Sequence, residues 1–230
     1  MHAGGDGCDL GPPAGGRQTV GGAVNVLALE CSTEQAGVAL LSDGHLVVSR
    51  PVETGRRRSQ GLFDAVEKLL QDAGWTWGDV EAVATGRGPG SYMGLRVSLT
   101  AAQGWALPGR KTVWAVSSAA ALAAEWLAEH PEESRAVASG AARRGMIWAG
   151  CFERAGGPAV RRIGDWRLLP AEERAAAWPD APWIESGRVP RAEWVGRLFA
   201  AGVPGEELQP IYLNPAVAIA PRFDATGRPL

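Results

Sequence analysis

The order of apolar runs between Val24 and Leu107 is the feature that most constrains the fold. Short apolar runs separated by tight polar turns, such as Ser42-Asp43-Gly44, predict antiparallel strands. Longer segments with apolar residues at helical spacing predict helices. The predicted order is strand, strand, strand, helix, strand, helix, at residues 24–29, 37–41, 46–48, 59–73, 82–84 and 91–107. This order predicts an α/β fold.

The rest of the chain partly repeats this order. The predicted strands and helices after Pro108 are a strand at 112–116, a helix at 117–130, strands at 136–138 and 147–152, and a helix at 191–201. We therefore expect two α/β halves in tandem, at 24–108 and 109–230, with a C-terminal segment that could return to the first half. The Gly/Pro-rich residues 1–23 are predicted to form a flexible tail.

Two of the predicted helices have a clear apolar stripe. Ser59 suits the N-cap of the first helix, and Gly74 suits its end. The residues predicted to be buried on this helix are Leu62, Phe63, Val66, Leu69 and Leu70. On the second helix the core-facing stripe is predicted to be Leu95, Leu99, Ala102 and Ala106.

Composition excludes several kinds of chemistry. The formal net charge is -2, so no overall basic footprint indicates direct binding to nucleic acid. The 3 Cys and 3 His include no C-x-x-C and no H-x-x-x-H spacing, which argues against a disulfide framework and against a metal site. The most apolar later stretch, 113–127, is interrupted by polar residues and cannot span a bilayer. A cytoplasmic location without cofactor or metal is therefore expected.

The loop between the predicted strand at 82–84 and the helix that follows contains the most informative motif, Gly86-Arg87-Gly88-Pro89-Gly90-Ser91. Backbone N–H groups in such a position could bind a phosphate. The motif is not a Walker A loop, and its glycine spacing is not that of a dinucleotide fingerprint. Pro89 also removes one N–H donor. The competing interpretation is structural: the glycines allow tight turns and close helix packing.

The segment from Gly86 to Arg96 resembles the signature of the TsaB (YeaZ) family. Gly86, Gly88, Pro89, Gly90, Ser91, Gly94 and Arg96 carry this resemblance, as a structural or vestigial phosphate loop. Weaker matches, in the same order along the chain, are Leu27-Ala28-Leu29-Glu30, Val38-Ala39-Leu40, Ala102-Gln103-Gly104, Ala115-Val116-Ser117-Ser118, Ala142-Arg143 and Pro210-Ile211-Tyr212-Leu213. This family is the dimerisation subunit of the bacterial machinery that makes threonylcarbamoyladenosine next to the tRNA anticodon.

The resemblance implies an actin-like ATPase (ribonuclease H-like) fold with two βββαβα-type halves and mixed sheets. It also implies a non-catalytic subunit that binds a TsaD-like catalytic subunit and helps to dock a TsaE-like P-loop ATPase. Contact with tRNA would then occur only through the complex, and a homodimer is expected when the partner is absent. The partner surface would lie on the two helices of the first half, with Ser59, Leu62, Met93, Val97, Thr100 and Gly104 as candidate contacts.

The sequence departs from the family pattern at one chemically important position. Glu30-Cys31 stands where the family usually has Asp-Thr, and in an actin-like ATPase that acid would position metal-bound water. An actin-like ATPase or kinase remains the first alternative, with Glu30 as its one candidate acid near the loop. A glycoprotease-like peptidase is the second alternative, although no metal-ligand pair or catalytic triad supports it.

Overall fold

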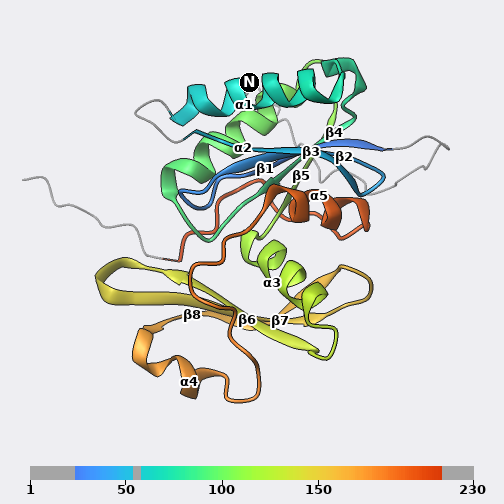
Figure 1. Cartoon of the computed structure of the whole chain (residues 1–230). Coiled ribbons are helices and arrows are strands. Elements are labelled where there is room, and N and C mark those ends of the chain that lie inside the picture. Colours follow the sequence, from blue (N-terminus) through green and yellow to red (C-terminus); the bar gives the residue numbers. More distant parts are fainter. Residues whose placement is uncertain (1–23, 54–57, 214–230) are drawn as a thin grey trace, which may run out of the picture.

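The predicted three-strand meander forms one side of a five-stranded sheet. The computed structural model describes residues 24–53 and 58–213, and it gives this sheet the order β3-β2-β1-β4-β5 (Figure 1). The strands are β1 (Asn25–Glu30), β2 (Gly37–Ser42), β3 (His45–Pro51), β4 (Ala82–Gly86) and β5 (Thr112–Val116). β1 pairs antiparallel with β2 and parallel with β4, so the sheet is mixed.

Alternation along β1 explains how this sheet supports two layers of helices. Leu27 and Leu29 belong to the core formed with α1 (Arg58–Ala73) and α2 (Tyr92–Ala106). Val26 and Ala28 belong to the core on the other face, which includes residues of α3 (Ser118–Glu129) and α5 (Ala192–Ala200). Because successive side chains of a strand point to opposite faces, a fully apolar strand is suited to burial on both faces.

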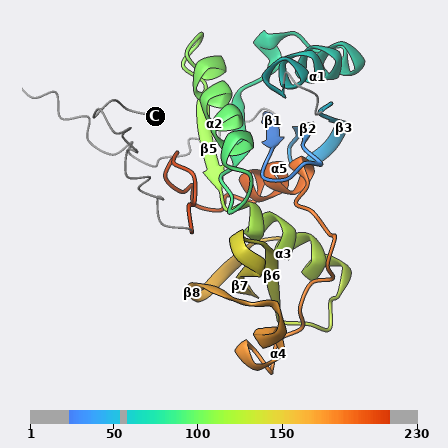
Figure 2. The ribbon, with the colours of Figure 1, turned by 90° about the vertical axis from the view of Figure 1, so that its left-hand side faces the viewer.

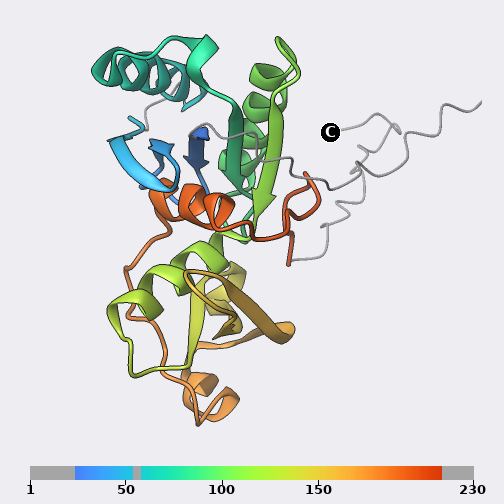
Figure 3. The same cartoon turned by 90° about the vertical axis from the view of Figure 1, so that its right-hand side faces the viewer.

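The second sheet is smaller and lies on the far side of α3 and α5 (Figures 1 and 2). It contains β6 (Arg135–Ala141), β7 (Met146–Arg154) and β8 (Val160–Pro170), all antiparallel. The short helix α4 (Arg174–Ala177) lies beyond this sheet (Figure 3). Three single-turn helices complete the described elements, at Trp77–Asp79, Arg143–Gly145 and Ala171–Glu173.

The structure differs from the sequence-based expectations in three elements. The strand at 112–116 was expected to open the second half, but β5 pairs in parallel with β4 and is an edge of the first sheet. The strand β8 and the helix α4 were not predicted. β8 mixes charged and apolar residues without a regular alternation and is mostly exposed at the edge of its sheet, so it lacks the continuous apolar run that marks the other strands.

The C-terminal part of the described chain returns to the first sheet. The helix α5 packs on β1, β2 and β4, where Val195 and Leu198 are buried in the shared core. The tail expected at residues 1–23 lies outside the described residues. Every helix within the described ranges is too short or too polar to span a bilayer.

Candidate functional site

The signature loop joins the end of β4 to the start of α2 and is fastened on both sides. Ser91 caps α2, because its Oγ accepts a hydrogen bond from the N–H of Gly94 at 3.3 Å. The N–H of Ser91 donates to the carbonyl of Ser32 at 2.7 Å. The loop is thus tied to the turn that follows β1.

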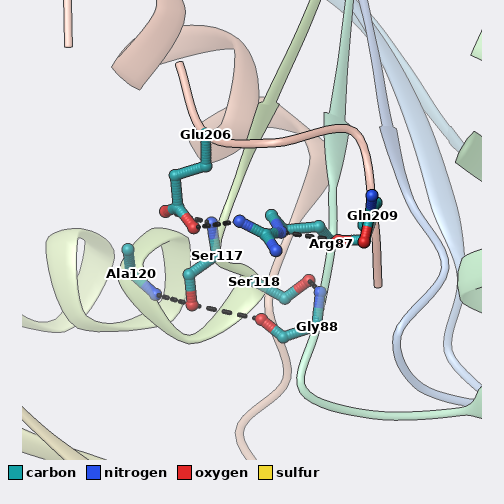
Figure 4. Close-up of polar contacts among 7 residues, drawn as sticks. All are labelled: Arg87, Gly88, Ser117, Ser118, Ala120, Glu206 and Gln209. Atoms are coloured by element: carbon teal, nitrogen blue, oxygen red, sulfur yellow. Dashed lines mark hydrogen bonds and ion pairs between the residues drawn. The ribbon is translucent and has the colours of Figure 1, made fainter. Parts of the chain in front are cut away.

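On its other side the loop is tied to the N-terminus of α3. The N–H of Gly88 donates to Ser118 Oγ at 2.9 Å, and the carbonyl of Gly88 accepts from Ser117 Oγ at 3.1 Å (Figure 4). The N–H of Arg87 donates to the carbonyl of Val116 at 2.9 Å. Because these loop donors are used within the protein, the geometry favours the structural interpretation of the motif over a phosphate cradle.

Two signature glycines are required by close approach of the backbone. A Cβ at Gly94 would overlap the carbonyl oxygen of Cys31, and a Cβ at Gly90 would overlap that of Ser32. Gly88 has a φ of +97°, which other residues rarely adopt. These glycines let α2 and its loop pack directly on the turn after β1.

Glu30 lies under this loop and is 1% exposed. Its Oε1 accepts a hydrogen bond from the N–H of Ser32 at 2.7 Å, and a Cβ at Gly86 would collide with its carboxyl group. Burial raises the pKa of Glu30 above its ordinary value of 4.5, against the opposing effect of hydrogen bonds from Ser32 and Ser118. The one acid expected near the loop is therefore enclosed, and it is poorly placed to hold metal-bound water for an incoming nucleotide.

Replacement of Glu30 by glutamine is expected to make the protein relatively more stable as the pH rises. The folded state holds the Glu30 proton to higher pH than the unfolded state, because its pKa is raised on folding. The wild type therefore loses stability relative to Glu30→Gln above pH 4.5, by about 1.4 kcal/mol for each pH unit between the two pKa values. Urea unfolding of both proteins between pH 4.5 and pH 8 measures this difference; a difference that does not change with pH would contradict the prediction.

A cleft of about 940 Å³ lies beside the fastened loop. Arg87 and Ser117 line it from the side of the first sheet, and Phe152, Arg162 and Trp166 line it from the second sheet. Figure 4 shows that Glu206, from the C-terminal segment, reaches Arg87 and the backbone of Ser117 in this region. Local sequence pattern gives no sign of this role for Glu206, because Glu206 lies 119 residues from Arg87 in the chain.

A second hollow is an apolar groove between α1 and α2, with a volume of about 480 Å³. We call this hollow the helix groove. It is lined by Phe63, Arg96, Val97, Thr100, Ala101, Gly104 and Trp105. Three of the candidate partner contacts thus come together in one place, at Val97, Thr100 and Gly104. Met93 is on the same helix and is 60% exposed.

The other two candidate contacts are placed differently. Leu62 is 1% exposed and belongs to the core under α1, so we leave it out of any partner surface. The helix α1 begins at Arg58, so Ser59 lies in the first turn rather than at the N-cap.

The groove also contains aromatic residues that the sequence analysis did not assign to it. Phe63, predicted to be buried, is 51% exposed, because the buried stripe of α1 follows Leu62, Val66 and Leu69 and leaves Phe63 at its margin. Its ring makes an edge contact with Trp105, with centroids 5.0 Å apart. The spacing of Val97, Ala101 and Trp105, four residues apart, was the available signal.

Arg96 connects the helix groove to the C-terminal segment. Its guanidinium lies 4.4 Å from the ring centroid of Tyr92, and its Nε donates to the hydroxyl of Tyr212 at 3.2 Å. The rings of Tyr92 and Tyr212 are stacked, with centroids 5.2 Å apart. Among the described residues, no group of three or more His, Cys, Asp or Glu side chains could hold a metal ion.

Comparison with known proteins shows which family this chain resembles in sequence. A family model described as TsaD, tRNA N6-adenosine threonylcarbamoyltransferase, matches residues 48–190. The chain is 35% identical to the tRNA threonylcarbamoyladenosine biosynthesis protein TsaB of Escherichia coli over 96 residues, which are 41% of each chain. It is 32% identical to TsaB of Haemophilus influenzae over 111 residues, covering 48% of this chain and 47% of the relative.

A solved structure extends the likeness to most of the fold. YeaZ from Pseudomonas aeruginosa superimposes with a TM-score of 0.67 at 29% identity, covering 83% of this chain and 100% of that one. The α/β class and the mixed first sheet expected from the sequence are thereby confirmed, whereas the second sheet is entirely antiparallel and not mixed as expected. The chain belongs to the TsaD family that the matching family model describes. Within that family it belongs with the TsaB (YeaZ) proteins. The alignments span less than half the length of the Escherichia coli and Haemophilus influenzae relatives.

Proposed function

We propose that this chain is a non-catalytic partner subunit required for N6-threonylcarbamoyladenosine formation in tRNA, and that it binds and stabilises a TsaD-like catalytic subunit. Family membership supports a role in forming this modified nucleoside, since two relatives carry the name tRNA threonylcarbamoyladenosine biosynthesis protein. The single structural observation that carries the proposal is the helix groove, an apolar hollow on the surface of α1 and α2.

The chemistry of the helix groove suits a helical partner. Phe63 and Trp105 supply aromatic side chains of the kind that dominate the binding energy of protein interfaces. Gly104, where a Cβ would find no neighbour within 4 Å, leaves room for close approach of another helix. A matching pair of helices on the partner would bury this hollow between four helices.

Two features of the signature loop and of the acid beneath it support a role without catalysis. Glu30 is enclosed beneath the loop rather than open to the cleft. The N–H groups of Arg87 and Gly88 are already bonded within the protein. A chain with this geometry would act through its partner, with a TsaE-like ATPase and tRNA meeting it in the complex, in the cytoplasm; a homodimer through the same groove would form in the partner's absence.

Reconstitution tests this proposal directly. The TsaD-like and TsaE-like subunits of the same organism, with the enzyme that supplies the threonylcarbamoyl donor, are incubated with unmodified tRNA, with and without this chain. The modified nucleoside is then measured by chromatography of digested tRNA. We expect product only when this chain is present, and co-purification of the TsaD-like subunit with it. Full activity without the chain would refute the proposal.

The catalytic alternatives are tested on the pure chain. Equilibrium dialysis with labelled ATP separates a nucleotide-binding enzyme from a partner subunit, and a casein assay addresses the peptidase. We expect neither ATP turnover nor proteolysis. Robust ATP hydrolysis by the chain alone would favour the actin-like enzyme instead.

A further inference from the structure

The segment from Val203 to Tyr212, which we call the C-terminal strap, has no regular secondary structure. It crosses the cleft where Arg87 and Ser117 line it, which we call the polar end of the cleft. It is nevertheless fastened along its length. The N–H of Glu206 donates to the carbonyl of Ala115 on the edge strand β5 at 2.8 Å. The indole of Trp114 donates to the carbonyl of Val203 at 3.1 Å.

Arg87 makes the central attachment of the strap. One guanidinium nitrogen lies 2.9 Å from Glu206 Oε2, and Nε donates to the carbonyl of Gln209 at 2.7 Å (Figure 4). The carbonyl of Arg87 accepts from the N–H of Ile211 at 2.8 Å. The Arg87 side chain is 14% exposed and the Glu206 side chain is 36% exposed, so the ion pair is shielded from water on the Arg87 side and open to it on the Glu206 side.

Glu206 also satisfies a donor at the start of α3. Its Oε1 accepts from the N–H of Ser117 at 2.9 Å, while its Oε2 faces Arg87. Ser117 is the N-cap of α3, where the first N–H groups of a helix lack partners within the helix and favour a negative charge. One carboxylate therefore fills a position with two converging donors, one of them charged.

The far end of the strap reaches α2. Tyr212 stacks on Tyr92 and accepts a hydrogen bond from Arg96. Arg96 is at the same time a lining residue of the helix groove. The strap thus joins the start of α3, the signature loop and the helix α2.

We propose that the C-terminal strap is a latch that closes the polar end of the cleft, with the Glu206 carboxylate as the chain's own anion in place of an external one. Bound in this way, Glu206 excludes phosphate-bearing ligands from Arg87 and the start of α3. The proposal concerns the isolated chain and does not depend on the proposed function, so the failure of one leaves the other standing.

Hydrogen exchange of the full chain, with Glu206 replaced by glutamine, tests the latch. Glutamine can still accept the Ser117 N–H, but it offers no charge to Arg87. We expect about tenfold faster exchange in residues 203–212, with the rest of the chain unchanged. The control is Glu207→Gln, which removes the same charge from the neighbouring exposed residue. Equal exchange in wild type and Glu206→Gln would overturn the proposal.

Titration with inorganic pyrophosphate, followed by calorimetry, tests the anion role. We expect binding by Glu206→Gln and by Glu206→Ala, loss of that binding when Arg87→Gln is added, and no binding by wild type or Glu207→Gln. Equal pyrophosphate binding by wild type and Glu206→Gln would overturn the proposal, and so would a released strap in Glu206→Gln without any pyrophosphate binding.

Discussion

Replacement of Gly94 by alanine is expected to lower the free energy of unfolding by about 1–3 kcal/mol, the usual cost of overpacking a filled core. The added methyl group would overlap the carbonyl oxygen of Cys31, and a backbone atom cannot move aside as a flexible side chain can. The start of α2 would have to shift away from the turn after β1. Urea unfolding followed by circular dichroism measures the change.

Gly104 provides the matched control on the same helix. A Cβ there would meet nothing within 4 Å, so Gly104→Ala is expected to stabilise the chain by about 0.5–1 kcal/mol, because alanine loses less backbone entropy in a helix. If both substitutions destabilised the protein equally, close approach at Gly94 would not be the reason for its glycine.

A glutamate at Val97 is expected to raise the dissociation constant of the complex with the TsaD-like subunit by about 100-fold or more. Val97 lines the helix groove between aromatic and small residues, and a partner docked there would bury the new charge without a counter-ion, at a cost of several kcal/mol. Met93→Glu, at the exposed start of the same helix, should have the same sign. Calorimetry with the purified subunits gives the constants.

Val47→Glu is the control for this substitution. Val47 is an exposed valine on the edge strand β3 and does not line the helix groove, so the same change of residue type should leave the affinity within about twofold of wild type. Unfolding curves of both variants verify that the fold is retained. Unchanged binding by both Val97→Glu and Met93→Glu would show that the partner docks elsewhere.

Local pattern was sufficient for the elements with strong periodicity. β1, β2 and β4 are continuous apolar runs because the first sheet is covered on both faces. The core stripe of α2 was also predicted correctly, as Leu95, Leu99, Ala102 and Ala106 are all buried. In contrast, β8 was missed because an exposed edge strand has no continuous apolar run to distinguish it.

The candidate site was predictable only in part. Val97, Thr100 and Gly104 were identified through the family resemblance and do line one groove, whereas Leu62 is a core residue. Phe63 and Trp105 could not be paired from sequence, because their contact depends on how α1 lies against α2. Helical periodicity fixes which residues share a face of one helix, but it does not fix the rotation of that helix against its neighbour.

The sequence by itself determined the strand and helix order of the first sheet, the glycine-rich signature and the absence of paired metal ligands. These properties depend on residue type and short spacing, which the chain displays directly. Only the tertiary structure decided that β5 completes the first sheet, that the glycines accommodate a neighbouring backbone, and that Glu206 meets Arg87 across 119 residues. Those contacts arise from chain segments that are distant in sequence and become neighbours only when the two sheets and their shared helices pack together.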